Sequence, residues 1–301
     1  MNQRTINKAF KVEGKGLHTG RWVHACFQPA PPDHGVRFCR TDLAGQPTYE
    51  ASARYVTGTN RGTVLENGAW TVSTVEHALS ALYAMGITNC LIALDGPEMP
   101  ILDGSAKPFV EAIEQVGMVE QEREAKTWVV TEPFAYEDGK GSVMRITPAD
   151  DYEVEVVIDF HSPVLGRQTA ELKDLTTYPS QIAEARTFCF MREIRPLLAL
   201  GLIKGGDLQN ALVIYDKHMW QWKMNRLSRK FGQPYRDASK LGYMSPLHFE
   251  NEPARHKLLD VMGDLSLIGC RIQGHIYVER PGHGFNTTCA KMLLEERNKK
   301  I

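Results

Sequence analysis

In both halves of the 301-residue chain, segments patterned as strands come before segments patterned as helices. Strand segments alternate or are rich in β-branched residues, whereas helical segments repeat apolar residues every three or four positions. The strand candidates are 21–28, 36–39, 128–131, 143–147, 152–160 and 272–279, and the helix candidates are 73–85, 105–116, 179–186 and 251–268. Runs of strands followed by runs of helices favour an α+β architecture.

A polar segment without apolar periodicity, VEQEREAKT at 119–127, lies between the two halves. We place a linker at 123–127, between an N-terminal domain of residues 1–122 and a C-terminal domain of residues 128–301. The chain length also favours about two domains. A polar, aromatic-rich segment at 215–243 has weak helical periodicity and no catalytic pattern, so we expect a surface insertion there.

Composition excludes several classes of protein. The net charge of −1 implies no general affinity for polyanions, so nucleic acid is not an expected partner. The N-terminus lacks the apolar core of a secretory signal, and no apolar stretch is long enough to span a bilayer, so no stable membrane anchor is expected. The six cysteines form no CxxC pair, which favours reduced thiols in a cytoplasm.

The helix candidate at 251–268 carries an unusual polar stripe. His256, Asp260 and Asp264 are spaced by four and therefore share one face, while the opposite face is apolar. Exposure to solvent is one explanation of the stripe. A metal ion is another, because imidazole and carboxylate both bind zinc and this spacing lets two side chains converge. The HxxxD pattern alone leaves both explanations open.

Three other features are ambiguous by themselves. Ser73 and Glu76 match a capping box, which would make Glu76 a structural cap and the following His77 a surface residue. The alternative makes His77 a metal ligand and Glu76 a catalytic base; this segment alone favours the cap. His283 lies between two glycines, where a surface turn is favoured over a ligand site, and Thr187 carries no signal of its own.

Taken together, seven segments resemble one family, the UDP-3-O-acyl-N-acetylglucosamine deacetylases. The matching runs are GKGLHTG (14–20), STVEHALSAL (73–82), DGPEMPILDGSAKPFVEAI (95–113), ARTFCFMREI (185–194), GLIKGGDLQNALV (201–213), ARHKLLDVMGDL (254–265) and RPGHGFN (280–286). This resemblance implies a cytoplasmic zinc hydrolase of Gram-negative bacteria in the committed step of lipid A, and so lipopolysaccharide, synthesis. It also implies two similar two-layer α/β sandwich domains packed with their helices facing each other, and an active site in the interdomain cleft.

The resemblance assigns roles to individual residues. One catalytic Zn²⁺ would have three protein ligands: His77, His256 and Asp260. Glu76 would be the general base and His283 the general acid. Thr187 would donate a hydrogen bond to the oxyanion, and the carboxylate of Asp264 would orient His283. Contacts to the nucleotide, the sugar and the acyl chain would come from Asp159, Phe160, Arg280, Lys257, Phe188, Met191, Ile194, Ile203 and Val213.

The implied reaction removes acetate from the 2-acetamido group of UDP-3-O-(3-hydroxyacyl)-N-acetylglucosamine. The partner is thus a small UDP-sugar lipid, and a monomer is the default expectation. Two other hypotheses are a general metallo-amidase or peptidase, against which the absence of HExxH argues, and a non-enzymatic nucleotide-sugar binding module with a structural zinc ion.

The chain departs from the family in places. Cys189 stands where glycine is common, Lys204 adds a charge to the segment 191–213 that corresponds to the acyl-chain passage, and the insertion at 215–243 is long. Such an insertion resembles members fused to a C-terminal 3-hydroxyacyl dehydratase, which leaves open whether this chain is a piece of a longer protein. His18 matches a histidine near the family's active site, but a role in stabilising a turn is equally expected.

Overall fold

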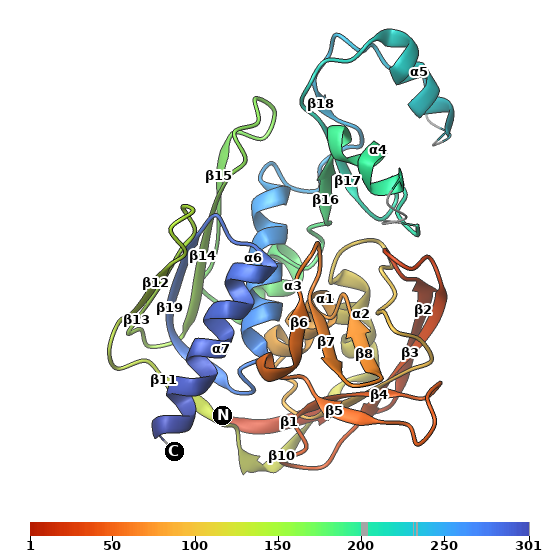
Figure 1. Cartoon of the computed structure of the whole chain (residues 1–301). Helices are drawn as coiled ribbons and strands as arrows, with labels where there is room; N and C mark the ends of the chain where they lie inside the picture. Colours follow the sequence, from red (N-terminus) through yellow and green to blue (C-terminus); the bar gives the residue numbers. More distant parts are fainter. Residues whose placement is uncertain (200–203, 231, 233, 301) are drawn as a thin grey trace.

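The computed structural model describes residues 1–199, 204–230, 232 and 234–300, and two mixed sheets form its main layers (Figure 1). The first sheet has the order β2 (Phe10–Lys15), β3 (Trp22–Pro29), β9 (Cys90–Leu94), β4 (Val36–Arg40) and β5 (Thr48–Glu50). The second has the order β12 (Phe134–Glu137), β13 (Val143–Thr147), β19 (Arg271–Glu279), β14 (Tyr152–Asp159) and β15 (Arg167–Leu172), and β11 (Thr127–Val129) also pairs with β19.

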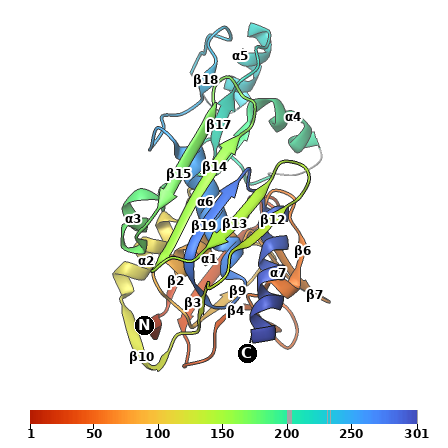
Figure 2. The same cartoon turned by 90° about the vertical axis from the view of Figure 1, so that its left-hand side faces the viewer.

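Helices cover one side of each sheet and meet in the middle of the molecule (Figures 1 and 2). On the first sheet lie α1 (Glu76–Ala84) and α2 (Lys107–Val116), and on the second lie α6 (Glu252–Ser266), α7 (His283–Lys300) and the one-turn α3 (Tyr178–Gln181). The most extensive helix–helix packing is between α1 and α6. One hydrophobic core includes residues of both sheets and of the helices between them. The predicted α+β fold with facing helices is therefore confirmed.

Smaller elements complete the chain. In the first half they are β1 (Asn2–Ile6), which pairs with β10 (Met118–Glu124), a hairpin sheet of β6 (Val56–Gly58), β7 (Val64–Asn67) and β8 (Trp70–Ser73), and the 3-10 turn Ala53–Tyr55. In the second half they are β16 (Phe188–Phe190), β17 (Leu212–Tyr215), β18 (Gly242–Tyr243), α4 (Met191–Ala199), α5 (Gln221–Lys230) and the 3-10 turn Leu175–Thr177. The elements from β16 to β18 form a protrusion at one end of the molecule (Figures 1 and 2).

Several predicted elements need correction. The polar stretch 119–127 is largely strand β10, because its backbone pairs with the N-terminal β1 although its side chains are polar. The predicted linker 123–127 thus overlaps the end of β10. The helix expected at 179–186 is a single turn that ends at Gln181. No helix in the described ranges is long and apolar enough to cross a membrane.

Candidate metal and catalytic site

The two central helices bring three candidate metal ligands together. His77 lies on α1, and His256 and Asp260 lie one turn apart on α6. One ligand atom from each residue lies within 4.8 Å of the other two, and all three side chains are buried. Gly263 allows the two helices this close approach, since a Cβ atom there would lie only 2.2 Å from the backbone oxygen of Glu76. The cluster therefore depends on a helix crossing between the two halves of the chain.

The chemistry of these side chains fits a metal ion. Burial lowers the pKa of His77 to about 3 and also lowers the pKa of His256, so both imidazoles are neutral. Burial alone would raise the pKa of Asp260, but nearby cations, the ammonium of Lys257 and the imidazolium of His283, lower it and keep the carboxylate ionised. Neutral imidazole and ionised carboxylate are the forms that bind metals.

Two hydrogen-bonding details support the same fit. Nδ1 of His256 lies 3.0 Å from the backbone oxygen of Ala185, so a proton held there leaves Nε2 free to bind an ion. The buried Oδ1 of Asp260 has no hydrogen-bond partner among the described residues, which is unusual for a carboxylate oxygen and is explained if a cation binds it.

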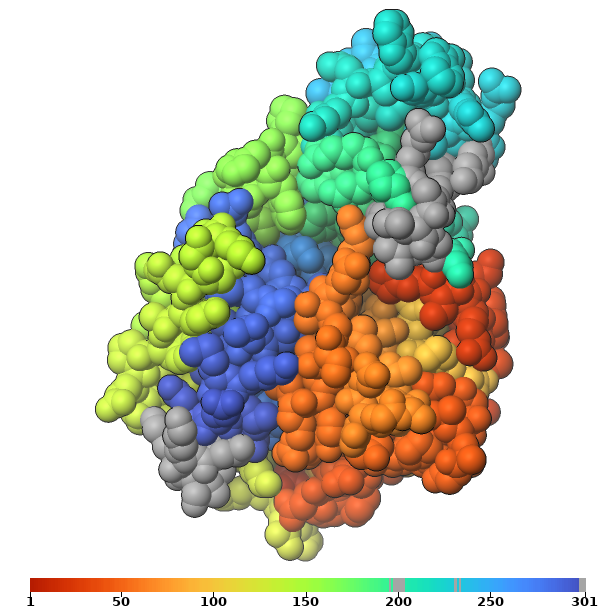
Figure 3. Space-filling view, in the orientation of Figure 1, coloured from red at the N-terminus to blue at the C-terminus, as the bar shows by residue number. Residues whose placement is uncertain are grey.

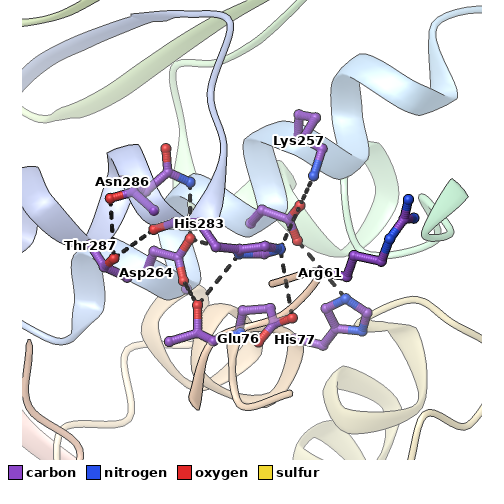
Figure 4. Close-up of polar contacts among 12 residues, drawn as sticks. Arg61, Glu76, His77, Lys257, Asp264, His283, Asn286 and Thr287 are labelled. Atoms are coloured by element: carbon purple, nitrogen blue, oxygen red, sulfur yellow. Dashed lines mark hydrogen bonds and ion pairs between the residues drawn. The ribbon is translucent and has the colours of Figure 1, made fainter. Parts of the chain in front are cut away.

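Glu76 lies beside this cluster (Figure 4) and lines a cavity next to it. Its Oε2 accepts a hydrogen bond from the backbone N–H of Thr63 at 3.0 Å, and its Oε1 lies 3.9 Å from Nε2 of His283. Burial, with further contributions from Asp264 and Asp260, raises the pKa of Glu76 to about 7 despite the opposing effect of His283. Such a carboxylate can accept a proton near neutral pH.

The capping-box interpretation of this segment is wrong. Helix α1 begins at Glu76 itself, and its N-cap is Val75, which makes no side-chain capping bond within the described chain. Ser73 is the last residue of β8, and its hydroxyl donates to the backbone oxygen of Pro97. The hairpin pairing of β7 with β8 and the bridge from Ser73 to Glu98 place Ser73 in a strand, so the local pattern has no helix turn to cap.

His283, at the start of α7, forms a pair with Asp264 (Figure 4). Its Nδ1 lies 3.0 Å from Oδ2 of Asp264, which also accepts a hydrogen bond from Asn286 at 2.9 Å. Burial would lower the pKa of His283, but Asp264, Asp260 and Glu76 raise it to about 9. The imidazole is therefore a cation at neutral pH, and the expectation of a histidine in a surface turn is wrong because only 10% of its side chain is exposed.

A cavity of about 340 Å³ connects these groups to the residues expected to bind substrate. Thr187 lines it and is held in place by a 2.7 Å hydrogen bond from its backbone N–H to Gly104. Lys257 lines it beside the candidate ligands, with Nζ donating to Oδ2 of Asp260 at 2.6 Å. Phe160 and Phe188 meet edge to face on its wall, with ring centroids 5.5 Å apart.

The remaining predicted substrate contacts are divided. Ile194 and Val213 line the cavity, whereas Met191 lies behind them and lines an adjoining hollow. Asp159 accepts a hydrogen bond from the backbone N–H of His161, and Arg280 is exposed beside Gly141; neither lines the cavity. Ile203 lies outside the described residues. The assignments of these side chains to parts of the substrate remain predictions.

Sequence reasoning missed several residues that shape the site. Thr63 is fully buried. Its hydroxyl donates to Oδ1 of Asp264 at 2.5 Å and its backbone N–H donates to Glu76, so it links these two carboxylates. Nothing in the sequence around Thr63 indicates this. Glu98, also fully buried, accepts hydrogen bonds from the backbone N–H groups of His18 and Thr19 and thereby holds the loop that carries His18 at the cavity. The matching run 95–113 contains Glu98 and could have drawn attention to it.

Comparison with known proteins decides the family. The family model described as LpxC, UDP-3-O-acyl N-acetylglycosamine deacetylase, matches residues 3–231 and 237–295. The chain belongs to this family. It is 48% identical over 297 residues to the bifunctional enzyme LpxC/FabZ of Porphyromonas gingivalis, covering 98% of this chain and 64% of that protein. It is 36% identical over 298 residues to the UDP-3-O-acyl-N-acetylglucosamine deacetylase of Myxococcus xanthus, covering 98% and 87%.

The two kinds of LpxC relative differ in length. A second bifunctional relative, from Bacteroides thetaiotaomicron, is 46% identical and is covered over 65% of its length. The chain therefore spans slightly less than two thirds of these bifunctional relatives, but most of the single-function deacetylase. The His-His-Asp cluster agrees with the metal dependence of the LpxC family.

Proposed function

We propose that this LpxC family member hydrolyses the 2-acetamido group of UDP-3-O-(3-hydroxyacyl)-N-acetylglucosamine and releases acetate, the committed step of lipid A synthesis, in the cytoplasm. The observation that carries the proposal is the meeting of three kinds of group in one cavity. A His-His-Asp cluster, a carboxylate with a raised pKa and a cationic histidine all lie beside an apolar wall. This combination suits the hydrolysis of an amide in an acylated substrate.

The metal ion would be a single zinc held by His77, His256 and Asp260. When bound, zinc supplies Lewis-acid polarisation of a carbonyl group and a more acidic water molecule. Three protein ligands of nitrogen and oxygen type are typical of catalytic rather than structural zinc sites. His77 comes from the predicted N-terminal domain and the other two from the predicted C-terminal domain, so the ion would also join the two.

Proton transfer follows from the protein groups. Glu76 would accept a proton from the attacking water, and its pKa of about 7 leaves a useful fraction ionised at neutral pH. The Nε2–H of His283 would be donated to the departing amine, which leaves poorly unless it is protonated. Asp264 would hold Nδ1 of the imidazole and favour its cationic form. Glu76 Oε1 and His283 Nε2 are 3.9 Å apart, so after each turnover the proton taken up by Glu76 would return to His283 through one bridging water molecule.

Other residues would position the substrate. The Thr187 hydroxyl would donate to the oxyanion that develops on the acetamide carbon, where a donor already in place is most effective. The ammonium of Lys257 and the aromatic ring of Phe160 suit the charged nucleotide end, and Ile194 and Val213 suit the acyl chain.

The test is acetate release from the UDP-sugar by the purified chain, with metal content measured in parallel. We expect about one zinc per chain. Glu76→Gln should retain the metal but lose about 10²- to 10⁴-fold in rate, the usual contribution of general base catalysis. Glu66→Gln, at an exposed site on β7, is the matched control and should keep full activity.

Two results would overturn this. A zinc-loaded wild type that binds the UDP-sugar without turnover would indicate a binding module. A fully active Glu76→Gln variant would show that the base lies elsewhere.

A further inference from the structure

The segment 215–243, here called the α5 insert, concentrates positive charge. It contains seven lysines and arginines but only two acidic residues, a net charge of +5 in a chain whose overall net charge is −1. Only one of the two acidic residues offsets this charge near the surface. Asp216 is buried against Arg192, which lies outside the insert, whereas Asp237 is partly exposed and accepts hydrogen bonds from Ser239. The insert therefore presents a surplus of cations.

Helix α5 places two of these cations and one aromatic ring on one exposed face. Trp222, Arg226 and Arg229 are spaced by four and three, so they share the exposed side of the helix. Met224 and Ser228 are buried on the opposite side. Trp220, Trp222 and Tyr235 are 72%, 60% and 74% exposed, although large aromatic side chains are normally covered in a folded protein.

The position of the insert leaves this face accessible. Figures 1 and 2 show α5 at the tip of the protrusion, away from both main sheets. In the space-filling view the same residues form the upper end of the molecule (Figure 3). A partner could contact the tip without covering the rest of the chain.

Apolar hollows connect this tip with the catalytic cavity. A surface hollow of about 390 Å³, lined partly by Lys217, Trp222 and Arg226, shares Met191 and Leu227 with a smaller apolar hollow beneath it. That second hollow shares Ile194, Leu208 and Val213 with the catalytic cavity. The wall expected to hold the acyl chain therefore continues towards the basic, aromatic face.

We propose that the α5 insert docks the protein reversibly on an anionic phospholipid bilayer. Tryptophan and tyrosine are the side chains that favour the headgroup level of a membrane, and lysine and arginine bind its negative surface. The combination of exposed rings and unbalanced cations fits this surface better than a neutral protein partner. Such docking is peripheral, so it is compatible with the prediction that no segment anchors the chain stably in lipid. Only the connection with the acyl wall rests on the proposed deacetylase function.

The test is co-sedimentation of the whole chain with two kinds of vesicle. One kind contains about one third phosphatidylglycerol, which is anionic, in phosphatidylcholine, and the other contains phosphatidylcholine alone. The charge variant is Lys217→Gln/Arg226→Gln/Arg229→Gln, and the aromatic variant is Trp220→Ala/Trp222→Ala. Lys8→Gln/Arg123→Gln/Lys126→Gln removes the same charge at exposed sites near β1 and β10, at the other end of the molecule. Melting curves and turnover in solution confirm that each variant is folded, since none of these residues lies in the catalytic cavity.

We expect the wild type and the control variant to bind anionic vesicles and to be released by salt. Each cation near such a surface contributes about five-fold in affinity, so the charge variant should bind about 100-fold more weakly. The aromatic variant should also bind more weakly while remaining salt-sensitive.

Three outcomes would overturn the proposal: equal binding to both vesicle types, equal loss in the control variant, or tighter binding to a single-stranded RNA than to the anionic vesicles. Dimerisation of the free protein that is abolished by the aromatic variant would also overturn it, because a second copy would then cover the face. Vesicle binding is measured without substrate, so its failure is distinct from failure of the deacetylase proposal.

Discussion

Replacing Gly263 with alanine tests whether the close crossing of α1 and α6 assembles the site. Gly263 lies between Asp260 and Asp264 on α6, directly against the backbone of Glu76. A Cβ atom at this position would lie 2.2 Å from the oxygen, 2.8 Å from the carbonyl carbon and 2.9 Å from the Cα of Glu76, whereas ordinary contact begins near 3.4 Å. These are backbone atoms, so a side-chain rotation cannot relieve the clash. The helices must separate by about 1 Å, the difference between the closest distance and ordinary contact.

The separation has two measurable effects. Alanine is intrinsically better than glycine inside a helix by about 1 kcal/mol, but overpacking a core typically destabilises by about 1–3 kcal/mol. The net loss in unfolding free energy should therefore reach about 2 kcal/mol, the difference between these two effects. The rate of turnover should fall more steeply, because Glu76 and His77 move with α1 while His256 and Asp260 stay with α6. A displacement of about 1 Å can reduce turnover by about 100-fold.

Thermal unfolding and acetate release measured on the same preparation would separate these effects. Gly14→Ala, on strand β2, is the matched control because its Cβ atom would meet Leu102 and Pro100 at an ordinary 3.5 Å. It should leave the rate unchanged. If Gly263→Ala retains the turnover and the melting temperature of the wild type, the helix crossing does not set the geometry of the site and the reasoning is refuted.

Three further predictions follow from the same geometry. Glu252→Gln breaks a buried ion pair with Arg186, with Nε and Oε1 2.8 Å apart, and should destabilise the protein by about 3–5 kcal/mol at neutral pH. Burial raises the pKa of Glu252, but the hydrogen bonds that it accepts from Arg186 and His248 more than offset burial, so the net pKa is lowered. The contribution of the ion pair to the free energy of unfolding is therefore complete above the ordinary glutamate pKa of about 4.3, and it is lost as the pH falls through the lower pKa of the folded state. Melting curves of both proteins should thus converge in acid, and a constant difference would contradict the ion-pair argument. Thr63→Val removes the hydroxyl donor to Asp264, so kcat should fall with little change in KM, whereas Thr63→Ser should restore it; equal losses in both would mean that Thr63 acts only through packing. Removal of the metal with a chelator should lower the melting temperature, since an ion held by α1 and α6 favours the folded state, and an unchanged melting curve would argue against the bridging site.

Local patterns determined much of the helical part of this protein. The stripe of His256, Asp260 and Asp264 could be read from the sequence because residues four apart share a helix face whatever surrounds them. Helix α6 and strand β19 were predicted nearly to the residue, because the helical period and the alternation of a strand are both local patterns. The family resemblance then indicated which distant residues belong with the stripe, which periodicity alone cannot do.

Tertiary contacts decided what local patterns left ambiguous. Glu76 resembles a helix cap in its own segment, and only the bonding of Ser73 to Pro97 and the approach of Thr63 and His283 place it in the cavity instead. The polar stretch that forms β10 has no strand pattern. It becomes a strand because its backbone pairs with β1, and backbone pairing does not depend on the polarity of the side chains. Thr63 gave no signal because its hydrogen bond reaches Asp264, 201 positions away. Periodicity reports forces between neighbours along the chain, whereas burial, proton affinity and strand pairing depend on atoms that only folding brings together.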